Sequence, residues 1–351
     1  MITDINLQNF RSYANDSFEL SPSVNIIVGP NASGKTNLLE AILMVSIGSS
    51  YRARDLEVMQ FNKPWARVEA HTKDFSRVIK IEKFEDNRTI KTFIINTKIV
   101  RRLNISQTLP VVLFEPNHLL TLNGPPELRR SYIDNILEQT VTGFKALKAR
   151  YKRALAQRNT QLKQGSSVTR LFVWNVRISE LGGQIFRERI ELIKKLQALV
   201  PDIYKSLSEH TDSIEFTYES DCKLTDYETD LLKKLEQHTE LDVLRGFTSH
   251  GPHRDDLKIS INSKLAGAVI SRGEARTVLL AMKVVEAKLI EEIRNQKPLL
   301  LFDDVFSELD RARRLALTKL LNNYQTFITT TDADVVVRYF TESALIIPTK
   351  S

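Results

Sequence analysis

The sequence predicts an α/β fold in which a core with a mixed sheet is interrupted by a helical lobe. Short apolar runs, typical of strands buried on both faces, lie far apart at 24–28 and 299–302. Between them, residues 126–208 are helical in character. We therefore expect the C-terminal strands to return to the N-terminal sheet. The resulting segments are the N-terminal part of the core at 1–125, the inserted lobe at 126–245 and the C-terminal part of the core at 246–351.

The first segment predicts mainly strands. Two short strands at 1–10 and 15–20 precede the buried strand 24–28, and a helix with an apolar face follows it. Apolar runs with charged flanks then predict an antiparallel sheet. Its strands are expected at 66–72, 77–84 and 90–96, and a further buried strand is expected at 111–114.

The second segment predicts an antiparallel helical hairpin. Apolar residues recur at helical spacing at Phe144, Leu147, Tyr151 and Leu155, and the run 164–167 has the composition of a turn. In the third segment the pattern alternates between strand and helix. The expected order is strand 257–261, helix 272–295, strand 299–302, helix 308–322 and strand 326–330.

The composition argues against a membrane protein and a disulfide framework. The chain has 351 residues and is 42% hydrophobic, which is enough for a large core. It has no apolar run long enough to span a bilayer, and its first residues lack the pattern of a signal peptide. Cys222 is the only cysteine and is expected to be structural. These features favour a cytoplasmic protein.

The basic residues are concentrated in one stretch. The net charge is +7, and residues 139–179 hold nine Lys or Arg and no Asp or Glu. The rest of the chain then carries 41 basic and 43 acidic residues. A localised positive patch is typical of a surface that binds nucleic acid or another polyanion. The alternative is a solvated helix face in a basic protein.

Five residues are the candidates for DNA contacts in this stretch. Lys145, Lys148 and Lys152 fall at i, i+3 and i+7 of the first hairpin helix, and Arg153 and Arg158 broaden the stripe. Such a face neutralises phosphates without reading sequence. Because few aromatic residues are expected on the surface, we expect duplex DNA or a junction of single and double strands.

A phosphate-binding loop follows the strand at 24–28. The motif has the spacing Gly-x-x-x-x-Gly-Lys-Thr and consists of Gly29, Pro30, Asn31, Ala32, Ser33, Gly34, Lys35 and Thr36. Its glycines permit backbone conformations that aim several N–H groups at one anion. Lys35 is expected to reach the β- and γ-phosphates, and the N-terminus of the next helix adds a favourable dipole.

Two carboxylates follow the apolar strand at 299–302. Asp303 is expected to hold Mg²⁺ together with the hydroxyl of Thr36, and Asp304 to polarise the attacking water. The separation of Lys35 and Asp303 is too large for a small GTPase and suits an ATPase split by an insertion. The alternative is a P-loop phosphotransferase whose lobe binds a small acceptor.

These residues resemble the ABC-type ATPase heads of the SMC superclass and, within it, the RecF family. The likeness runs nearly end to end and is weakest at 140–240. It rests on the opening Asn9-Phe-Arg-Ser-Tyr13, the loop and helix 29–42, Phe114-Glu-Pro116 with Arg129-Arg130, Gly251-Pro-His-Arg254 and Leu300-Leu-Phe-Asp-Asp-Val-Phe-Ser-Glu-Leu-Asp310.

The resemblance implies a signature loop before the long helix at 272–295. Ser271 and Gly273 keep its pattern, whereas Arg272 and Glu274 depart from it. In such heads this loop reaches the γ-phosphate held by a second subunit. Glu274 would weaken that closure unless Arg272 offsets its charge. The alternative interpretation is an ordinary capping box, in which Ser271 and Glu274 cap the helix.

Other family positions are also implied. Asp310 is the expected D-loop acid, which acts across the dimer. Thr330 or Thr331 would replace the switch histidine, with a plain threonine-rich strand end as the alternative. Gln60 is a candidate for the Q-loop.

The resemblance implies an ATP-dependent DNA-binding protein of recombinational repair, replication and the SOS response. It implies a weak, DNA-stimulated ATPase that forms a homodimer on ATP, clamps DNA at gaps or stalled forks and assists recombinase loading. Its expected partners are DNA and recombination mediator proteins, and its cofactors are ATP and Mg²⁺. A nucleotide-binding scaffold with negligible hydrolysis is a further alternative.

Overall fold

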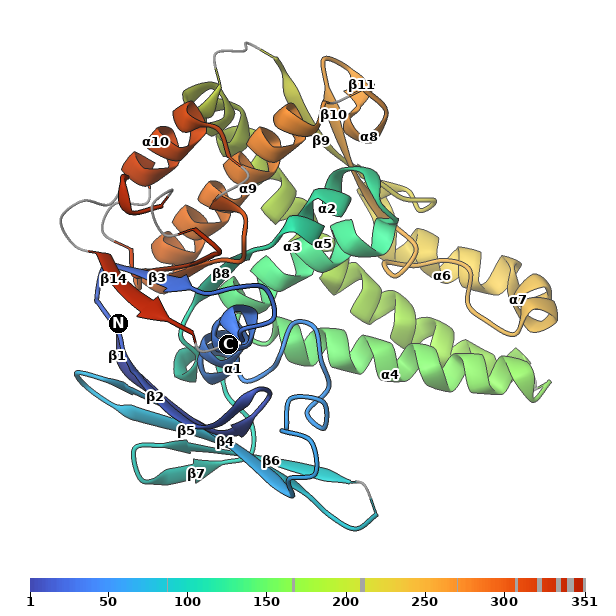
Figure 1. The fold of residues 1–351 in the computed structure, drawn as a ribbon. Coiled ribbons are helices and arrows are strands. Elements are labelled where there is room, and N and C mark those ends of the chain that lie inside the picture. Colours follow the sequence, from blue (N-terminus) through green and yellow to red (C-terminus); the bar gives the residue numbers. More distant parts are fainter. Residues whose placement is uncertain are drawn as a thin grey trace. The chain divides into compact units, whose positions relative to one another are not determined.

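The computed structural model describes residues 1–86, 88–165, 168–208, 212–269, 271–306, 309–320, 324–332, 336–339 and 344–349. The chain forms two compact units. Unit 1 contains residues 1–118, 206–208 and 286–351, and unit 2 contains 119–205 and 209–285 (Figure 1). None of the helices in the described ranges has both the length and the apolar character needed to cross a membrane.

A five-stranded parallel sheet forms the centre of unit 1. Its order is β14-β3-β13-β12-β8. The strands are β3 (Val24–Val28), β8 (Val111–Phe114), β12 (Leu299–Phe302), β13 (Thr326–Thr330) and β14 (Ala344–Pro348). Residues from the two ends of the chain thus pair directly, as the sequence predicted. Burial on both faces explains why β8 and β12 read as continuous apolar runs.

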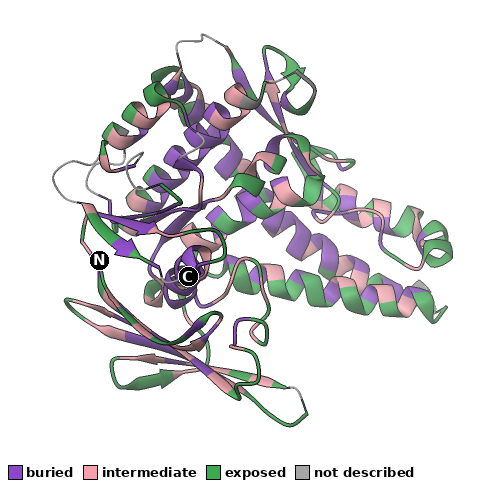
Figure 2. Ribbon diagram, viewed as in Figure 1, coloured by how far each residue is buried: buried purple, intermediate pink, exposed green. Residues whose placement is uncertain are grey.

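An antiparallel sheet of six strands completes unit 1, in the order β2-β1-β4-β5-β6-β7. The strands are β1 (Ile2–Phe10), β2 (Tyr13–Glu19), β4 (Trp65–Thr72), β5 (Ser76–Lys83), β6 (Thr89–Ile95) and β7 (Lys98–Val100). Helix α1 (Lys35–Ile47) contacts strands of both sheets, and its apolar side chains join theirs in one core. This explains why α1 is almost entirely buried (Figure 2).

Unit 2 is mainly helical. Its helices are α2 (Leu120–Asn123), α3 (Pro126–Thr140), α4 (Phe144–Lys163), α5 (Val168–Leu207), α6 (Tyr227–Gln237), α7 (Thr239–Arg245) and α8 (Ala266–Val269). Helices α4 and α5 occupy the stretch predicted as a helical hairpin, and residues 166–167 of the expected turn lie outside the described residues. A small antiparallel sheet contains β9 (Ile214–Glu219), β10 (Asp256–Ile261) and β11 (Lys264–Leu265).

Two helices follow in the C-terminal part of the chain. Helix α9 (Arg272–Arg294) begins in unit 2 and ends in unit 1, and α10 (Arg311–Leu320) precedes β13. Short 3-10 turns occur at Ile105–Gln107, Pro116–Leu119 and Leu224–Asp226.

The unit boundary differs from the expected start of the C-terminal segment at 246. Residues 246–285 belong to unit 2 because β10 pairs with β9 and because Asp256 forms an ion pair with Arg129 of α3 over 2.8 Å. The strand β9 was not expected from the sequence, although its alternating burial has the period of two that marks a half-buried strand.

Candidate nucleotide-binding site

The carboxyl ends of the five-stranded sheet bring the predicted site residues of unit 1 together. Because the strands are parallel, the residues that follow them gather along one edge, where ligands of open α/β sheets bind. The loop 29–36 follows β3, and Asp303 and Asp304 follow β12. Glu115 follows β8 at the same level, since Phe114 pairs with Phe302. The threonine run 329–331 lies at the end of β13.

The loop between β3 and α1 has the backbone of an anion-binding nest. Ala32 has φ of 66° and Gly34 has φ of 97°, both in the left-handed region that occurs in anion-binding nests. A Cβ atom on Gly34 would lie 2.8 Å from the hydroxyl of Ser12, so a side chain there would displace Ser12 and would also strain the backbone. The loop therefore fits a phosphate group by its backbone as well as by its sequence.

Lys35 places its charge inside this loop. Its ammonium group donates to the carbonyl oxygens of Gly29 and Pro30 over 2.8 and 2.9 Å. The residue is only 4% exposed. A buried cation among backbone dipoles is a suitable partner for a polyphosphate chain.

Asp303 accepts hydrogen bonds from two hydroxyl groups. Thr36 Oγ1 and Thr329 Oγ1 each lie 2.9 Å from Asp303 Oδ1. Burial raises the pKa of Asp303, although these two hydrogen bonds oppose the shift. A carboxylate and a hydroxyl that meet at this distance fit Mg²⁺, which prefers oxygen ligands.

Asp304 lies next to this group in an unusual backbone conformation. Its φ is 53°, in the left-handed region that few residues other than Gly, Asn and Asp adopt. Its backbone N–H donates to Thr329 Oγ1 over 2.8 Å. Thr329 therefore joins both predicted acids, whereas the expectation named Thr330 or Thr331. Thr330 donates to the carbonyl of Asp332 instead, and Thr331 is exposed.

A buried carboxylate fixes the loop that follows α1. Glu40 on α1 is fully buried and accepts hydrogen bonds from Arg11 over 2.9 Å and Arg52 over 3.0 Å. Burial alone would raise the pKa of Glu40, but hydrogen bonds from Arg11, Arg52 and Ser50 hold it below its usual value. Arg52 also donates to Asn37, in the first turn of α1, over 2.7 Å. The loop is thereby held beside the phosphate-binding end of α1.

Tyr51 and Glu115 also lie near Asp303, although no sequence motif indicated them. The Tyr51 hydroxyl is buried and has no hydrogen-bond partner among the residues that the structure describes. Burial raises the pKa of Tyr51, and the charges of Asp303 and Glu115 raise it further, so the phenol stays neutral and can donate. The available signal for Glu115 was an acid directly after a buried strand, the same pattern as at Asp303.

The signature-like residues form a capping box at the start of α9. The Ser271 N–H donates to a Glu274 carboxylate oxygen over 2.8 Å, and the Glu274 N–H donates to the Ser271 hydroxyl over 3.2 Å. Gly273 accepts a hydrogen bond from Thr277 over 3.0 Å. Ser271 is exposed, and the side chain of Arg272 lies outside the described part of the structure. The helix-capping interpretation of this motif is confirmed.

The remaining family positions have local contacts. Asp310 accepts the N–H of Arg313 over 2.9 Å and pairs with its guanidinium, so it caps α10. Ser307 and Glu308 of the expected D-loop lie outside the described residues. Gln60 donates its backbone N–H to the carbonyl of Asn9 over 2.8 Å, at the end of β1.

The predicted basic stripe on α4 divides into exposed, paired and buried residues. Lys145, Lys152 and Arg153 are exposed. Lys148 forms ion pairs with Glu138 over 2.5 Å and with Asp134 over 3.5 Å.

The prediction that Arg158 contacts DNA is wrong. It is 0% exposed, and its guanidinium binds Asp242, Asn175, Thr248 and the carbonyl of Leu235. All of these partners lie inside unit 2.

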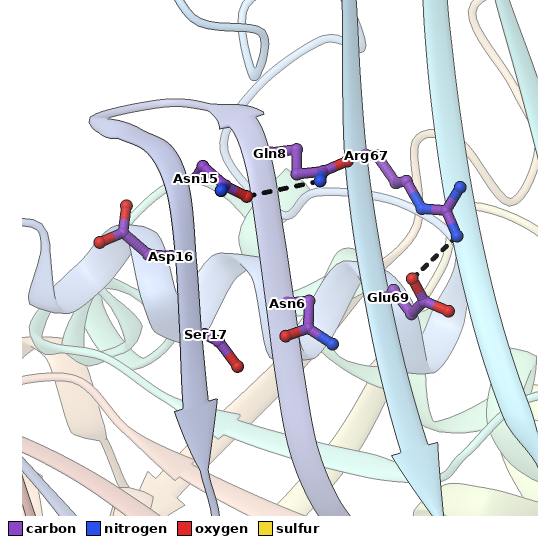
Figure 3. Close-up of a pocket in the computed structure, with 7 residues that line it drawn as sticks. All are labelled: Asn6, Gln8, Asn15, Asp16, Ser17, Arg67 and Glu69. Atoms are coloured by element: carbon purple, nitrogen blue, oxygen red, sulfur yellow. Dashed lines mark hydrogen bonds and ion pairs between the residues drawn. The ribbon is translucent and has the colours of Figure 1, made fainter.

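A polar hollow of about 310 Å³ lies on the six-stranded sheet (Figure 3). Asn6 and Gln8 of β1 line it, while the alternating residues Ile5 and Leu7 are buried in the core on the opposite face. Lining groups bind one another, as in the ion pair of Arg67 and Glu69 over 2.8 Å. The hollow includes none of the predicted site residues.

Comparison with known proteins agrees with this geometry. Residues 1–344 match the family described as RecF/RecN/SMC N terminal domain. The "DNA replication and repair protein RecF" of Heliobacterium modesticaldum is 35% identical over 342 residues, which cover 94% of this chain and 92% of that protein. The chain belongs to the RecF family. Its ABC-type core, split by a helical unit, is therefore a family feature, and membership assigns it to the ATPase class.

Solved structures extend the RecF likeness to three dimensions. The structure described as the recombination mediator protein RecF-ATPrS in RecFOR pathway is similar with a TM-score of 0.87 and 28% identity, over 99% of this chain and 96% of that one. An Smc head bound to the C-winged helix domain of ScpA has a TM-score of 0.54 and 18% identity, over 99% and 94% of the chains. The latter shows a shared fold alone.

Proposed function

We propose that this chain is an ATP-dependent DNA-binding protein of recombinational repair that hydrolyses ATP slowly. One observation supports this proposal above the others. The hydroxyl of Thr36, at the end of the phosphate-binding loop, lies 2.9 Å from the carboxylate of Asp303. The phosphate-binding loop and the acid after β12 are the groups that nucleotide binding requires, and in this RecF-family chain they meet. A relative in Heliobacterium modesticaldum is named as a DNA replication and repair protein.

In this proposal ATP binds at the carboxyl edge of the five-stranded sheet, against residues 29–36, Asp303 and Asp304. The loop N–H groups and the Lys35 ammonium bind its phosphates. Thr36 and Asp303 would hold Mg²⁺, which neutralises phosphate charge when bound. Asp304 orients and polarises the attacking water, and the neutral Tyr51 hydroxyl donates a hydrogen bond to a phosphate oxygen or to that water.

The active assembly in this proposal is a homodimer that closes on ATP. Ser271 and Gly273 of one copy approach the γ-phosphate held by the other, and Asp310 acts across the same interface. ATP favours closure because it binds the closed state better than the open one. Slow hydrolysis then releases the dimer, and DNA stimulates turnover by favouring closure.

DNA is the proposed partner of the exposed basic residues of α4. Lys145, Lys152 and Arg153 neutralise backbone phosphates, which favours duplex DNA or a junction over a specific sequence. Two copies in a closed dimer would clamp DNA at gaps or stalled forks. We further propose that the protein acts in the cytoplasm with recombination mediator proteins. In that role it would assist the loading of a recombinase.

A nucleotide-binding scaffold with negligible hydrolysis is the second candidate. The capping box between Ser271 and Glu274 favours it, because it holds the Glu274 carboxylate beside Ser271. A negative charge near a phosphate would weaken closure.

Single-turnover hydrolysis of ATP, with and without duplex DNA, separates the candidates. We expect slow, DNA-stimulated turnover in the wild type and none in Lys35→Ala, together with ATP-driven dimers by light scattering in the wild type alone. Binding of ATP without turnover would favour the scaffold. Normal ATP-driven dimers of Lys35→Ala would contradict the dimerisation proposal.

A further inference from the structure

A chain of hydroxyl groups connects the phosphate-binding loop to the C-terminal strand. Ser33 Oγ lies 2.6 Å from Thr349 Oγ1, and Thr349 Oγ1 donates to the carbonyl oxygen of Val28 over 3.1 Å. When the Thr349 hydroxyl donates to Val28, the Ser33 hydroxyl donates to Thr349, so one arrangement satisfies both hydroxyl hydrogens. Both residues are nearly buried, at 7% and 8% exposure. The Ser33 side chain is therefore turned toward the sheet and held there.

Thr349 follows β14 directly and continues its pairing. Its backbone N–H donates to the same Val28 carbonyl over 2.8 Å. Val28 is the last residue of β3, where the loop begins. The threonine thus contacts the loop at its first turn, through both its backbone and its side chain.

This contact also explains the first glycine of the motif. A Cβ atom at Gly29 would lie 2.2 Å from Thr349 Oγ1 and 2.5 Å from Ser33 Oγ. Real Cβ contacts are not this short, so a side chain at Gly29 would displace Ser33, Thr349 or both. The loop and the C-terminal strand are therefore packed against each other as one unit around Gly29.

We infer that the strand β14, through Thr349, positions the phosphate-binding loop and sets its affinity for nucleotide. The inference rests on the proposed binding of ATP and adds a residue far from the motif. An anchored Ser33 fixes the backbone between Ala32 and Gly34, the two residues of the loop that have positive φ. Preorganisation of this kind strengthens binding because less order has to be imposed when the ligand arrives.

The coupling must act in both directions. Strand β14 lies at the edge of its sheet and pairs with β3. If a docked β14 strengthens nucleotide binding by some factor, nucleotide strengthens the docking of β14 by the same factor. Nucleotide should therefore slow hydrogen exchange of the β14 amides, which an edge strand otherwise exposes.

The test compares Thr349→Val, Thr349→Ser and a matched control. Valine keeps the shape and the backbone bonds of Thr349 and removes the hydroxyl. Thr326→Val is the control, because Thr326 is also buried in this sheet and also donates to a backbone carbonyl, that of Tyr324, over 3.3 Å. Thr326 lies at the opposite end of β13 from the site.

We expect Thr349→Val to weaken ATP binding about fivefold while single-turnover hydrolysis at saturating ATP is unchanged. Thr349→Ser should restore affinity, and Thr326→Val should bind ATP normally. The slowing of β14 exchange by ATP should shrink in Thr349→Val. Equal ATP affinity in Thr349→Val and the wild type would overturn the inference, as would an equal loss in Thr326→Val. A wild type that binds no ATP would instead reject the proposed function.

Discussion

The guanidinium of Arg158 and the carboxylate of Asp242 form an ion pair 2.6 Å apart, with both side chains fully buried. Arg158 comes from α4 and Asp242 from α7, so the pair joins two helices of unit 2. Asn175 of α5 binds the same guanidinium over 2.7 Å. A charge in this position stabilises the packing of unit 2 only while its partners are intact.

Arg158→Leu should therefore destabilise the protein without a specific effect on DNA. It leaves the Asp242 charge buried without its cation, which costs roughly 3–5 kcal/mol of unfolding free energy. Arg153→Leu, five positions earlier on the exposed side, should change the unfolding free energy by less than about 0.5 kcal/mol. Denaturant unfolding of both variants measures this. Comparable stability of the two would contradict the structural role of Arg158.

DNA binding should depend on Lys152 more than on Lys148. The ammonium of Lys148 is already neutralised by Glu138, whereas Lys152 is exposed. Lys152→Ala should reduce the slope of log K against log salt by about one, and Lys148→Ala by less. Fluorescence anisotropy with duplex DNA over a salt series gives both slopes. Equal effects would mean that Lys148 leaves its ion pair to contact DNA.

Asp304→Asn should block hydrolysis and spare ATP binding. Asn tolerates the left-handed φ of 53° that this position requires, so the backbone should keep its path. Loss of the carboxylate should lower the single-turnover rate by at least about a hundredfold. Rapid-quench assays and ATP titration measure the two quantities separately. A rate within threefold of the wild type would assign the role of Asp304 to another group.

Tyr51→Phe should act in opposite directions on stability and activity. It removes a buried hydroxyl that has no hydrogen-bond partner among the described residues, so the free protein should be unchanged or more stable, by up to about 1 kcal/mol. If the hydroxyl donates to the nucleotide or the water, ATP affinity or turnover should fall about fivefold to tenfold. Thermal unfolding without nucleotide measures the stability of Tyr51→Phe against the wild type, and single-turnover kinetics measure its activity. Unchanged kinetics would remove Tyr51 from the site.

His253 should make the protein less stable in mild acid. Burial lowers its pKa to about 4, and the nearby charges of Arg254 and Arg130 act in the same direction. The neutral ring accepts a hydrogen bond from the Tyr151 hydroxyl over 2.6 Å when its other nitrogen donates to Thr248. In the unfolded state the His253 side chain has a pKa near 6.5 and therefore binds a proton more tightly than in the folded state.

Stability from His253 is therefore fully present above about pH 6.5 and is lost as the pH falls toward 4. The loss should reach roughly 3 kcal/mol at its limit, since the pKa of His253 is about 2.5 lower in the folded state. Denaturant unfolding at pH 7.5 and 5.0 should show a smaller difference in His253→Gln than in the wild type. An equal difference in both proteins would assign the acid sensitivity to other groups.

The sequence predicted the elements whose signals are local. Two strands were predicted because an apolar run is followed directly by a motif. They are the strand at 24–28, before the phosphate-binding loop, and the strand at 299–302, before Asp303. β14 was missed although Ala344-Leu-Ile-Ile347 is a short apolar run like the other strands of this sheet, because no motif follows it. Its position at the edge of the sheet, with Leu345 and Ile346 exposed, required the fold. The start of the C-terminal core was misplaced because the pairing of β9 with β10 is not visible in either strand alone.

The site residues that lie outside the sequence motifs could be identified only once the fold was known. Thr329 and Glu115 reach the edge of the sheet only through parallel pairing, and Tyr51 reaches it because Glu40 holds the loop around it. Arg158 is different, since its burial could have been predicted from the sequence. It lies seven positions after Tyr151 and therefore on the buried face of α4, yet its charge suggested solvent.

The pairing of β3 has a consequence for how the chain is made. Its neighbours in the sheet are β13 and β14, which begin at Thr326 and Ala344. At typical elongation rates, a ribosome needs roughly 15–60 seconds to add the intervening residues. Throughout that time β3 lacks both of its sheet neighbours, whereas α1 already has β1, β4, β5 and β8 to pack against and still lacks β13. The loop after β3 therefore gains its full set of sheet neighbours, and with them its capacity to be stabilised by nucleotide, only after Ala344–Pro348 have been made.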